Sequence, residues 1–520
     1  MILINSAAYV GLEFQAEIGI IPPCMLPIGN KKLIEFQVEY FTSSFPNEEI
    51  TVSIPESYHL SINETRLIDD LHVFVIKVPD EFSLAESILY VMNVKMEREL
   101  GSLRMLHGDT LIKDLPKNLD VIAIAQRDQN YNWHQEFLSK SNDSFVWAGY
   151  FSFSSRLDLL RALATSKGDF VKAIDNYRKQ ISVDVVEVHH WYDCGHINTY
   201  FDARANITTQ RSFNSLSIDK GVVTKSSQKS LKMQAEINWF KSIPASLKKF
   251  RPQFIDHGIL PNGNVFYQIE FLSLLPLNEL YVHGRNPASF WRRIFNMVQE
   301  YFIISANVRK FSDEELDFIK QLSDCLYNKK TRKRFDTFIK SKHLDISKEI
   351  YYGDVYLGSV NDIINDCINR TLILPCVPNI MHGDLCFSNM LFDVRGQSLK
   401  LIDPRGVDED DRLTILGNQT YDLAKLTHSV IGMYDFIIAG RYQISDTKKG
   451  EVLVFDIDDR LQTIQADFLE TQFIDNINIK QIVPAVVLLF LSMLPLHDDR
   501  PDRQHAMLLN AFRLYHDFVD

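Results

Sequence analysis

The sequence predicts a two-domain α/β protein: a mostly parallel, doubly wound sheet, then a small antiparallel sheet that leads into a large helical body. Three observations support this. The first two hundred residues or so alternate short apolar runs with segments of helical periodicity, the pattern of βαβ units. From Arg211 the apolar runs are spaced like hairpins, and about a hundred largely helical residues follow. At 520 residues the chain is too long for one hydrophobic core.

Composition narrows the class of protein. A hydrophobic share of 46% with 23% charged residues is typical of a soluble globular protein. The formal net charge of -12 argues against a nucleic-acid binder, which normally carries a basic face. The basic segment Lys329–Phe335 ("KKTRKRF") is interpreted first as a solvated helix face and only weakly as an anion site.

The six cysteines contain no CxxC pair and are most simply free thiols in a reducing compartment. The N-terminus lacks the basic region and cleavage site of a signal peptide. The most apolar stretch, Ile482–His497, is short for a bilayer span and carries two prolines, so it is expected to be a buried helix. We therefore expect a cytoplasmic protein that does not insert into membranes.

The first domain is expected to contain strands that are buried on both faces, separated by amphipathic helices. The clearest helices are predicted over Lys31–Phe45 and Leu84–Leu100. The polar stretch Asn198–Gln210 is interpreted as the boundary, which gives a first domain over residues 1–205. The predicted strands are Met1–Ala7, Glu49–Ile54, His72–Val78, Arg104–Thr110 and Asp120–Gln126.

The second domain is expected to have two lobes. Arg211–Ser227 predicts two strands joined by an Asp-Lys-Gly turn, because Gly221 tolerates positive φ. An amphipathic helix over Ser230–Pro244 and a hairpin over Gln253–Leu272 complete a small lobe at 211–275. Residues 276–520 then form a helical large lobe, which is the two-lobed plan of the kinases.

Two acidic motifs stand in the large lobe. In "HGDLCFSN", Asp384 can accept the proton of a hydroxyl nucleophile, and Asn389 can offer a neutral oxygen to Mg²⁺. In "LIDPRG", Asp403 follows an apolar stretch and supplies an anionic metal ligand. Each motif taken singly is also compatible with an ordinary turn, but their order and spacing together favour phosphoryl transfer.

These motifs, with "GNQTYDLAKL" after them, resemble the aminoglycoside phosphotransferase and choline kinase superfamily, which has a protein-kinase-like fold. The Ile-Asp-Pro-Arg-Gly motif is similar to a branch found in bacterial capsule and surface-polysaccharide clusters. The resemblance implies that Asp384 is the catalytic base and that Asn389 and Asp403 bind metal. It makes Asp422, like His382, a residue that supports the loop, although Asp422 could equally serve as a helix N-cap. Arg405 would contact phosphate or the acceptor, with a structural salt bridge as the alternative.

The same resemblance implies a nucleotide site in the small lobe. Lys225 would bind the α- and β-phosphates, and Glu236 on the next helix would position it. "YQIEFL" resembles the hinge, so adenine would bind near the backbone of Glu270 and Leu272.

One departure concerns the phosphate loop. No glycine-rich loop precedes the lysine, and "SFNSLS" stands there instead. Asn214 and Ser215 are the candidates for side-chain and backbone donors to phosphate. The expected cofactors are Mg²⁺ and ATP, with GTP as an alternative donor.

Three segments of the first domain resemble sugar-nucleotide nucleotidyltransferases: Ile21–Phe41, "LHGDTLI" (Leu106–Ile112) and "HHWYDCGHINTY" (His189–Tyr200). The resemblance implies a Rossmann-like fold. It also implies that Asp109 and Asp193 hold Mg²⁺ on the triphosphate of a second nucleotide such as CTP or GTP.

The first domain departs from that family in its charges. The first loop, "SAAYVGLEFQAEIGI", has no arginine and few glycines, and Cys24 stands where the family has its signature lysine. Lys31 and Lys32 are nearby cations that could compensate, or else solvated loop residues. Asp109 and Asp193 could then be inherited turn residues in a domain that only binds a sugar phosphate or nucleotide.

The expected function is an enzyme of capsule or surface-polysaccharide precursor synthesis. Its kinase domain would phosphorylate a sugar, polyol or amino alcohol, and its first domain would activate or bind the product. A kinase with a non-catalytic first domain and a pseudoenzyme scaffold are the alternatives. The acceptor pocket is expected among the helices between Tyr281 and Thr371, and the sequence does not indicate an oligomeric state.

Overall fold

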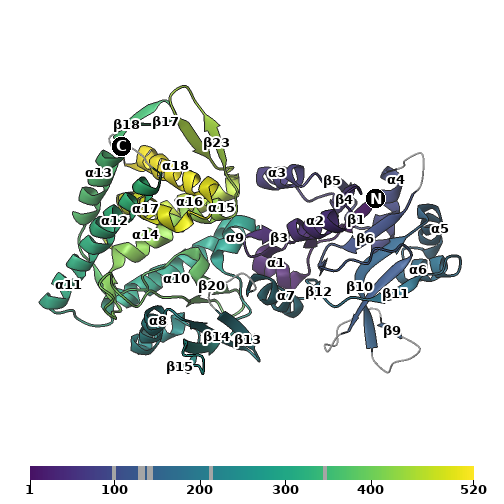
Figure 1. Ribbon diagram of the computed structural model, residues 1–520, viewed down its shortest axis with the longest axis horizontal. Coiled ribbons are helices and arrows are strands. Elements are labelled where there is room, and N and C mark those ends of the chain that lie inside the picture. Colours follow the sequence, from purple (N-terminus) through teal and green to yellow (C-terminus); the bar gives the residue numbers. More distant parts are fainter. Residues whose placement is uncertain (96–100, 127–134, 138–143, 210–214, 343–347, 520) are drawn as a thin grey trace. The chain divides into compact units, whose positions relative to one another are not determined.

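The computed structural model describes residues 1–95, 101–126, 135–137, 144–209, 215–342 and 348–519. The chain divides into two compact units (Figure 1). The first contains Met1–Gln210 together with three later residues, His283–Arg285. The second contains Arg211–Val282 and Asn286–Asp520.

The first unit is built on a mixed sheet with the strand order β11-β8-β10-β6-β1-β4-β5, and β9 pairs with β10. The strands are β1 (Ile2–Asn5), β4 (Ile50–Pro55), β5 (Phe74–Val78), β6 (Leu103–His107), β8 (Val121–Gln126), β9 (Gln135–Phe137), β10 (Ser144–Phe153) and β11 (Asp184–Glu187). The neighbouring pairs β6-β1, β1-β4, β4-β5 and β8-β11 are parallel, whereas β10 runs antiparallel to both β6 and β8. The expected α/β fold with a mostly parallel sheet is therefore confirmed for this unit.

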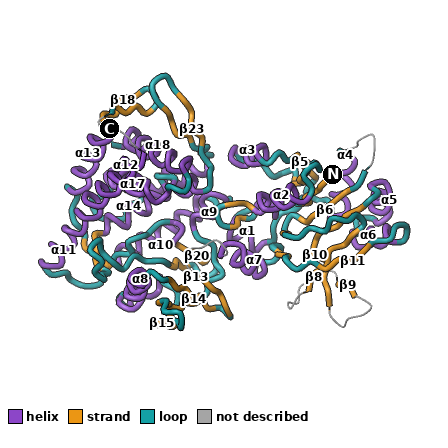
Figure 2. Tube along the Cα trace, viewed as in Figure 1, coloured by secondary structure: helices purple, strands orange, loops and turns teal. Residues whose placement is uncertain are grey.

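Helices cover both faces of the sheet. In β10, Phe151 packs against Phe170 of α6 with ring centroids 5.1 Å apart, and its neighbour Tyr150 packs against Phe41 of α2 at 6.4 Å. Since successive strand residues point to opposite faces, the two helices lie on opposite sides. Figure 2 shows α5 and α6 side by side. The helices are α1 (Leu12–Ile18), α2 (Leu33–Ser44), α3 (Ile62–Asp70), α4 (Leu84–Val94), α5 (Arg156–Ser166), α6 (Phe170–Arg178) and α7 (Ile197–Thr209).

The second unit begins with a four-stranded antiparallel sheet in the order β13-β14-β16-β15, followed in the chain by helices. Lys220 and Gly221 both have positive φ, 46° and 78°, so they form a two-residue hairpin turn of the kind that fits strand twist. The sheet and its helix are β13 (Ser215–Asp219), β14 (Val222–Ser227), α8 (Ser230–Ser242), β15 (Phe254–Ile259) and β16 (Val265–Glu270).

The rest of the second unit is mainly helical. Its helices are α9 (Leu277–His283), α10 (Ala288–Asn307), α11 (Asp313–Asp324), α12 (Lys330–Lys342), α13 (Val360–Leu372), α14 (Gln419–Val430), α15 (Tyr434–Ile438), α16 (Asp459–Glu470), α17 (Ile479–Met493) and α18 (Pro501–Phe518). A π-helical turn, Cys325–Lys329, joins α11 to α12. The helical segment Ile479–His497 is long and apolar enough to cross a membrane by length and composition, but most of it is buried in the unit. It packs against α13, α14 and α18, as expected for a core helix.

Short strands frame the motif loops of the second unit. The pair β19 (Pro378–Ile380) and β22 (Leu416–Asn418) is antiparallel, and so is the pair β20 (Met390–Asp393) and β21 (Ser398–Leu401). A further sheet has the order β18-β17-β24-β23. Its strands are β17 (Glu349–Tyr352), β18 (Val355–Ser359), β23 (Gln443–Asp446) and β24 (Glu451–Val454).

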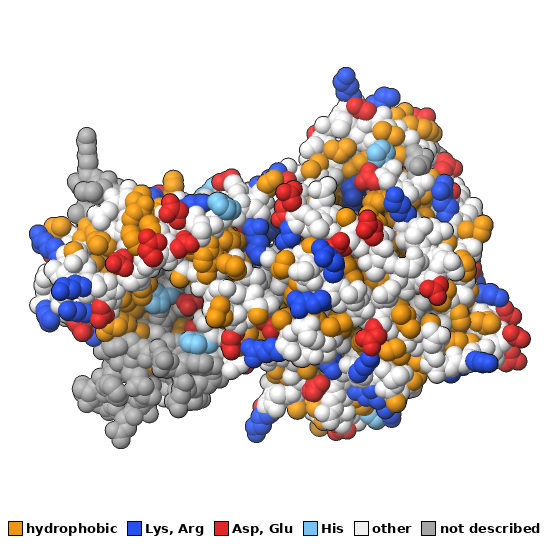
Figure 3. Space-filling view, turned by 180° about the vertical axis from the view of Figure 1, so that it is seen from behind, with side chains coloured by type: hydrophobic (Ala, Val, Ile, Leu, Met, Phe, Trp, Pro, Cys, Tyr) orange, Lys and Arg blue, Asp and Glu red, His pale blue; other side chains and the backbone are white. Residues whose placement is uncertain are grey.

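Two features differ from the sequence-based expectation. The first unit runs to Gln210, the end of the polar stretch expected as the boundary, and so past the expected limit of 205; the stretch itself forms α7, because Tyr200 and Phe201 bury their rings within the first unit. The segment His283–Arg285, expected in the large lobe, groups with the first unit. On the face drawn in Figure 3, acidic and basic side chains are interspersed among the described residues.

Candidate active site

The loop 382–389 leaves β19 through a turn that requires glycine. Gly383 has φ of +80°, and a Cβ there would lie 2.6 Å from the Cβ of Arg405. A side chain at this position would be strained by the backbone and would overlap a fixed atom. The glycine therefore allows the two acidic motifs to pack directly against each other.

Asp422, in the first turn of α14, binds the backbone of the same loop. Its carboxylate accepts the backbone N–H groups of His382 at 2.8 Å and Gly383 at 2.7 Å. Complete burial raises the pKa of Asp422 to about 7, although these two hydrogen bonds act in the opposite direction. The structure thus places Asp422 as a support of the loop; Asn418 is the N-cap of α14.

His382 is a structural histidine in a fixed tautomer. Its Nδ1 lies 3.3 Å from the N–H of Asp384 and its Nε2 lies 3.0 Å from the carbonyl of Ile402. Nδ1 must accept from that N–H, so Nε2 carries the proton and donates to the carbonyl. Burial lowers the pKa of His382 to about 4, so the ring is neutral at pH 7 and joins the two motif loops.

Asp384 is held between an amide and an ammonium group. Asn389 Nδ2 donates to the backbone carbonyl of Asp384 at 2.9 Å and to its carboxylate at 3.0 Å. Lys425 Nζ lies 2.8 Å from the other carboxylate oxygen. Burial raises the pKa of Asp384, but the charge of Lys425 outweighs it and holds the pKa below its usual range. The side chain is 40% exposed, so the carboxylate is open to solvent despite these contacts.

The small-lobe lysine joins two acids. Lys225 Nζ lies 2.8 Å from Glu236 Oε2 and 2.9 Å from Asp403 Oδ1. Tyr267 donates its hydroxyl to the same Glu236 oxygen at 2.6 Å. Burial acts to lower the pKa of Lys225, but the charges of the two carboxylates raise it by more, so this lysine is charged. Asp403 itself has left-handed backbone geometry, with φ of +55°, which is rare for a non-glycine residue and frequent at functional sites.

The donor set fits a hard divalent cation. Asp384, Asn389 and Asp403 lie on neighbouring segments, since the N–H of Ile402 donates to the carbonyl of Asn389 at 3.0 Å. The amide nitrogen of Asn389 faces Asp384, so its side-chain oxygen is the atom left to serve as a ligand. Carboxylate and amide oxygens of this kind suit Mg²⁺, which keeps its other positions for water and phosphate.

Three charged residues next to these motifs, Lys330, Glu409 and Lys425, were not predicted from the sequence as site residues. Glu409 pairs with the predicted Arg405, and Lys330 Nζ lies 3.0 Å from the same Glu409 oxygen. Lys425 pairs with Asp384. Its position in the motif "YDLAKL", three residues after Asp422, was a usable signal, since residues three apart on a helix lie on one face.

The other residues expected at the small-lobe nucleotide site lie at the edge of its sheet or outside the described residues. Asn214 lies outside the described residues, and Ser215 is the first residue of β13. Glu270 accepts the N–H of Gln253 with its carboxylate and donates its own N–H to Gln253, so its side chain serves the sheet. Leu272 follows β16 and accepts the N–H of Leu274.

In the first unit, Asp109 and Asp193 converge. Oxygens of both carboxylates lie within 3.3 Å of the position that a Cβ on Gly195 would take. Asp193 accepts from the hydroxyl of Thr199 at 2.7 Å and from the N–H of Gly195 at 3.2 Å. Burial raises the pKa of Asp109. The strands β7 (Thr110–Ile112) and β12 (Trp191–Asp193) pair antiparallel and bring the two acids together.

The cations beside the first loop are already engaged. Lys32 is 4% exposed and lies 2.9 Å from Glu64 Oε1, and Lys31 pairs with Glu39 at 3.3 Å. The alternative that Lys32 is only a solvated loop residue is therefore wrong, because its side chain is buried and neutralises Glu64.

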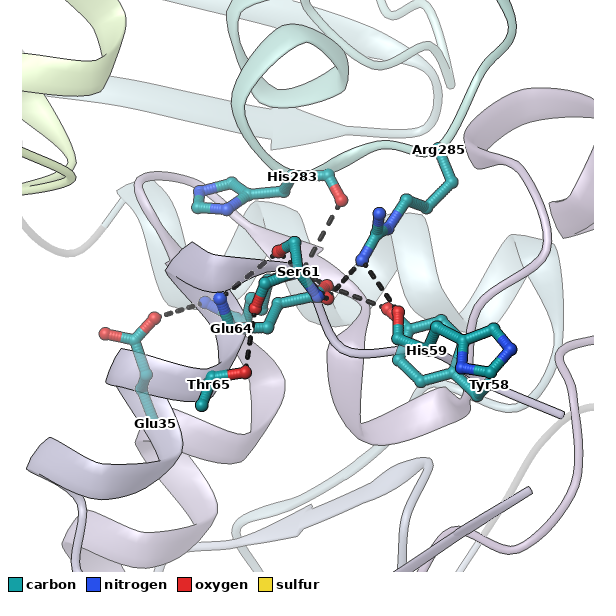
Figure 4. A network of polar contacts seen from close by, with 9 residues as sticks. Glu35, Tyr58, His59, Ser61, Glu64, Thr65, His283 and Arg285 are labelled. Carbon is teal, nitrogen blue, oxygen red and sulfur yellow. Dashed lines mark hydrogen bonds and ion pairs between the residues drawn. The ribbon is translucent and has the colours of Figure 1, made fainter. Parts of the chain in front are cut away.

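Glu64 is the centre of a polar network that Figure 4 shows. Tyr58 donates its hydroxyl to Glu64 at 2.7 Å, and Arg285 forms an ion pair with it. Although burial acts to raise it, the two cations Lys32 and Arg285 hold the pKa of Glu64 far below its usual range. Arg285 also lines a cavity of about 630 Å³ beside the first loop. The other lining residues are Tyr9, Gln15, Ile20, Ser57, Tyr58 and His59.

No family model matches the chain, and no curated protein matches it. Among solved structures, a nucleoside-diphosphate-sugar pyrophosphorylase from Vibrio cholerae RC9 is 17% identical, with a TM-score of 0.34. The match covers 39% of this chain and 99% of that one, over the N-terminal part. A structure described as a candidate glucose-1-phosphate thymidylyltransferase from Bacillus anthracis, in complex with sucrose, is 12% identical. It has a TM-score of 0.30 and covers 39% of this chain and 94% of that one. At these scores and identities, neither likeness decides the family or the activity.

Proposed function

We propose that the second unit is a Mg²⁺-dependent small-molecule kinase that transfers the γ-phosphoryl group of ATP to a hydroxyl of a sugar or polyol. The observation that carries this proposal is the ion-pair chain from Glu236 through Lys225 to Asp403, 178 residues away along the sequence. It joins the small antiparallel sheet to a loop whose Arg405 N–H donates to the carbonyl of His382, two residues before Asp384. A buried lysine and two acids in this arrangement are the parts that phosphoryl transfer needs.

The roles follow from the contacts. The hydroxyl of the acceptor would lose its proton to Asp384 as its oxygen bonds to the γ-phosphorus, and the bond to the bridging oxygen of ADP would break. A low pKa keeps Asp384 ionised and able to accept the proton and align the hydroxyl. Lys425 would contact the transferred group as negative charge spreads over its oxygens. Bound Mg²⁺ would neutralise the phosphates, held by Asp403 and Asn389.

The test is phosphoryl transfer from ATP with Mg²⁺ to a panel of sugars, polyols and amino alcohols. Asp384→Asn keeps the shape of the side chain and removes the base, so transfer should fall by at least about a hundredfold. Asp336→Asn makes the same chemical change at an exposed position of α12 and should leave transfer unchanged. Equal rates in Asp384→Asn and the parent protein would refute the role of Asp384 as base.

A second candidate function belongs to the first unit: transfer of a nucleotidyl group from an NTP to a sugar phosphate, with release of pyrophosphate. It is supported by the convergence of Asp109 and Asp193 at Gly195. The cation that the first loop lacks could be Arg285, which lines the cavity beside it. Pyrophosphate release that disappears in both Asp109→Asn and Asp193→Asn would support this activity. Sugar-phosphate or nucleotide binding without any release would favour a binding domain.

A place in capsule or surface-polysaccharide precursor synthesis is part of the proposal, because a kinase makes the phosphate that a nucleotidyltransferase consumes. This role rests on the sequence resemblance of the Ile-Asp-Pro-Arg-Gly motif. A pseudoenzyme scaffold is the remaining alternative. Any Mg²⁺-dependent ATP turnover that Asp384→Asn removes would exclude it.

A further inference from the structure

A compact cationic cluster lies beside the proposed catalytic acid. Lys330 and Arg405 share the single carboxylate of Glu409, with the Lys330 Nζ 3.0 Å from its oxygen. The side chains of Lys330 and Arg405 are only 14% and 16% exposed. Two largely buried cations therefore pair with one acid, which is itself 28% exposed. Buried charge normally carries its own balance, so a surplus of one sign at a buried site needs an explanation.

The excess positive charge also acts on the buried side chain of Tyr421. It precedes Asp422 on α14 and is fully buried, which would raise the pKa of its hydroxyl. Instead the pKa of Tyr421 lies below its ordinary value, because Lys330, Lys425 and Arg405 act on it together. The same crowding lowers the pKa of Lys330, where burial and the charge of Arg405 both act against the ammonium form.

The cluster is adjacent to Asp384. Tyr421 and Lys425 are four residues apart on α14, so they lie on the same face of the helix. Lys425 Nζ is 2.8 Å from Asp384, and the charge of Asp384 is also felt by Arg405. This face of α14 therefore lies between Glu409 with its two cations and Asp384, the carboxylate that would receive the proton of the acceptor.

Lys330 is directed into this cluster by an unusual piece of backbone. Its N–H donates to the carbonyl of Cys325, five residues earlier, which closes the π-helical turn between α11 and α12. Such turns are rare and are frequent at functional sites. The preceding residue, Lys329, has a side chain that is 71% exposed, so the turn separates a solvated lysine from a buried one.

Glu409 has room to leave the cations. It lies in the loop between Asp403 and β22, and it also lines a cavity of about 530 Å³ between this loop and the end of α11. A ligand oxygen that replaced its carboxylate could therefore displace the side chain without moving α12.

We propose that Lys330 and Arg405 bind an anionic group of the acceptor, a carboxylate or a phosphate, and that Glu409 occupies this site until the acceptor displaces it. This inference rests on the proposed kinase function and narrows its substrate to a hydroxy acid or a phosphorylated sugar or polyol. Arginine with lysine suits either anion, because the guanidinium binds two oxygens side by side and the ammonium adds a point charge.

The first experiment measures binding, so it does not depend on turnover. Calorimetry on the full chain, with ADP and Mg²⁺ saturating, compares D-glycerate with glycerol and glucose 6-phosphate with glucose; inorganic phosphate is the minimal probe. We expect at least one anionic probe to bind about tenfold or more tightly than its neutral partner, since charge-assisted hydrogen bonds are the strong ones. The pair that shows the preference identifies carboxylate or phosphate.

Variants tie the preference to the cluster. Lys330→Gln should remove most of the anion preference, while Lys329→Gln, the same change one residue earlier, should leave it. Glu409→Gln should tighten anion binding several-fold because the competing carboxylate is gone. Should Lys330→Gln fail to fold, the double variant Lys330→Gln with Glu409→Gln is used in its place, because it removes one charge of each sign.

The outcomes separate the two proposals. Anion binding that Lys330→Gln abolishes, without any phosphoryl transfer, would keep the anion site and refute the kinase. Transfer to neutral acceptors at rates equal to those of their anionic partners would keep the kinase and refute the anion site. Loss of binding in Lys329→Gln as large as in Lys330→Gln would reduce the effect to surface charge and overturn the assignment.

Discussion

Replacing Gly383 by alanine tests whether the two acidic motifs depend on direct packing. Two costs coincide at this residue: its φ of +80° and the 2.6 Å that would separate the new Cβ from the Cβ of Arg405. Gly221, in the same unit, offers a matched control with φ of +78° and nothing within 4 Å of its Cβ position. Gly221→Ala should therefore cost about 1–2 kcal/mol for the left-handed conformation. Gly383→Ala should add about 1–3 kcal/mol of overpacking, because a Cβ is fixed to its backbone and cannot swing away.

Urea denaturation measures both variants on the same unit, and the free energy of unfolding should fall in the order parent, Gly221→Ala, Gly383→Ala. Phosphoryl transfer supplies a second measurement. Gly383→Ala shifts the loop that carries Asp384 and should lose most of the activity, whereas Gly221→Ala should retain more of it. Equal stabilities of the two variants would show that the contact with Arg405 relaxes without cost. Full activity in Gly383→Ala would refute the view that the turn positions the acid.

Three further predictions concern buried charges. Lys225→Ala leaves Glu236, 1% exposed, without its closest cation and should cost about 3–5 kcal/mol in urea denaturation, part of which a second change, Glu236→Gln, should restore. Burial raises the pKa of Asp435 from 3.8 to about 7, so between these values the folded chain keeps a proton that the unfolded chain loses. The free energy of unfolding should therefore fall by at most ~4 kcal/mol as the pH rises from about 4 to 7. This pH dependence should become weaker in Asp435→Asn. In the first unit, Glu64→Ala leaves the buried Lys32 and the partly buried Arg285 without their shared acid and should cost about 3–5 kcal/mol. Ser83→Ala, which removes the N-cap of α4 in the same unit, should cost roughly 1 kcal/mol. A stability loss in Glu64→Ala no larger than that of Ser83→Ala would contradict the network in Figure 4.

The sequence predicted β1, β4, β5, β6 and β8 because each contains a short run of apolar residues; β1 and β4 are buried on both faces, whereas β5 is buried on one. It did not predict β11, which pairs parallel with β8. It did not predict β10, which runs antiparallel between β6 and β8. The periodicity of a strand does not indicate whether it pairs parallel or antiparallel, because that depends on which neighbouring strand it joins. The polar stretch taken as a boundary became α7 because a few buried aromatic residues, Tyr200 among them, outweigh a polar average.

In the second unit, the candidate residues were found from motifs, and the structure brings Lys225, Glu236 and Asp403 into contact. The kinase-like fold itself stays a prediction. Lys330 was missed because its segment, "KKTRKRF", has the composition of a solvated helix face, and most of it is one. The π-helical turn turns this one lysine inward, and a single inserted residue in a helix leaves no sign in composition. Lys425 was overlooked because a lysine next to a motif looks ordinary until its partner, Asp384, is placed beside it.

The charges of the second unit follow one rule. Each acid assigned to metal binding or proton transfer is paired with a lysine, Asp403 with Lys225 and Asp384 with Lys425, and the cations assigned to the acceptor are paired with Glu409. Placing an unpaired ion in such surroundings costs several kcal/mol. A site built from pairs avoids this cost. In the proposed kinase, a ligand would exchange partners instead of adding uncompensated charge: phosphate would bind Lys225 as the metal binds Asp403, and an anionic acceptor would bind Lys330 and Arg405 in place of Glu409. On this proposal, the site would favour ligands that bring both signs of charge, a metal–nucleotide on one side and an anion on the other.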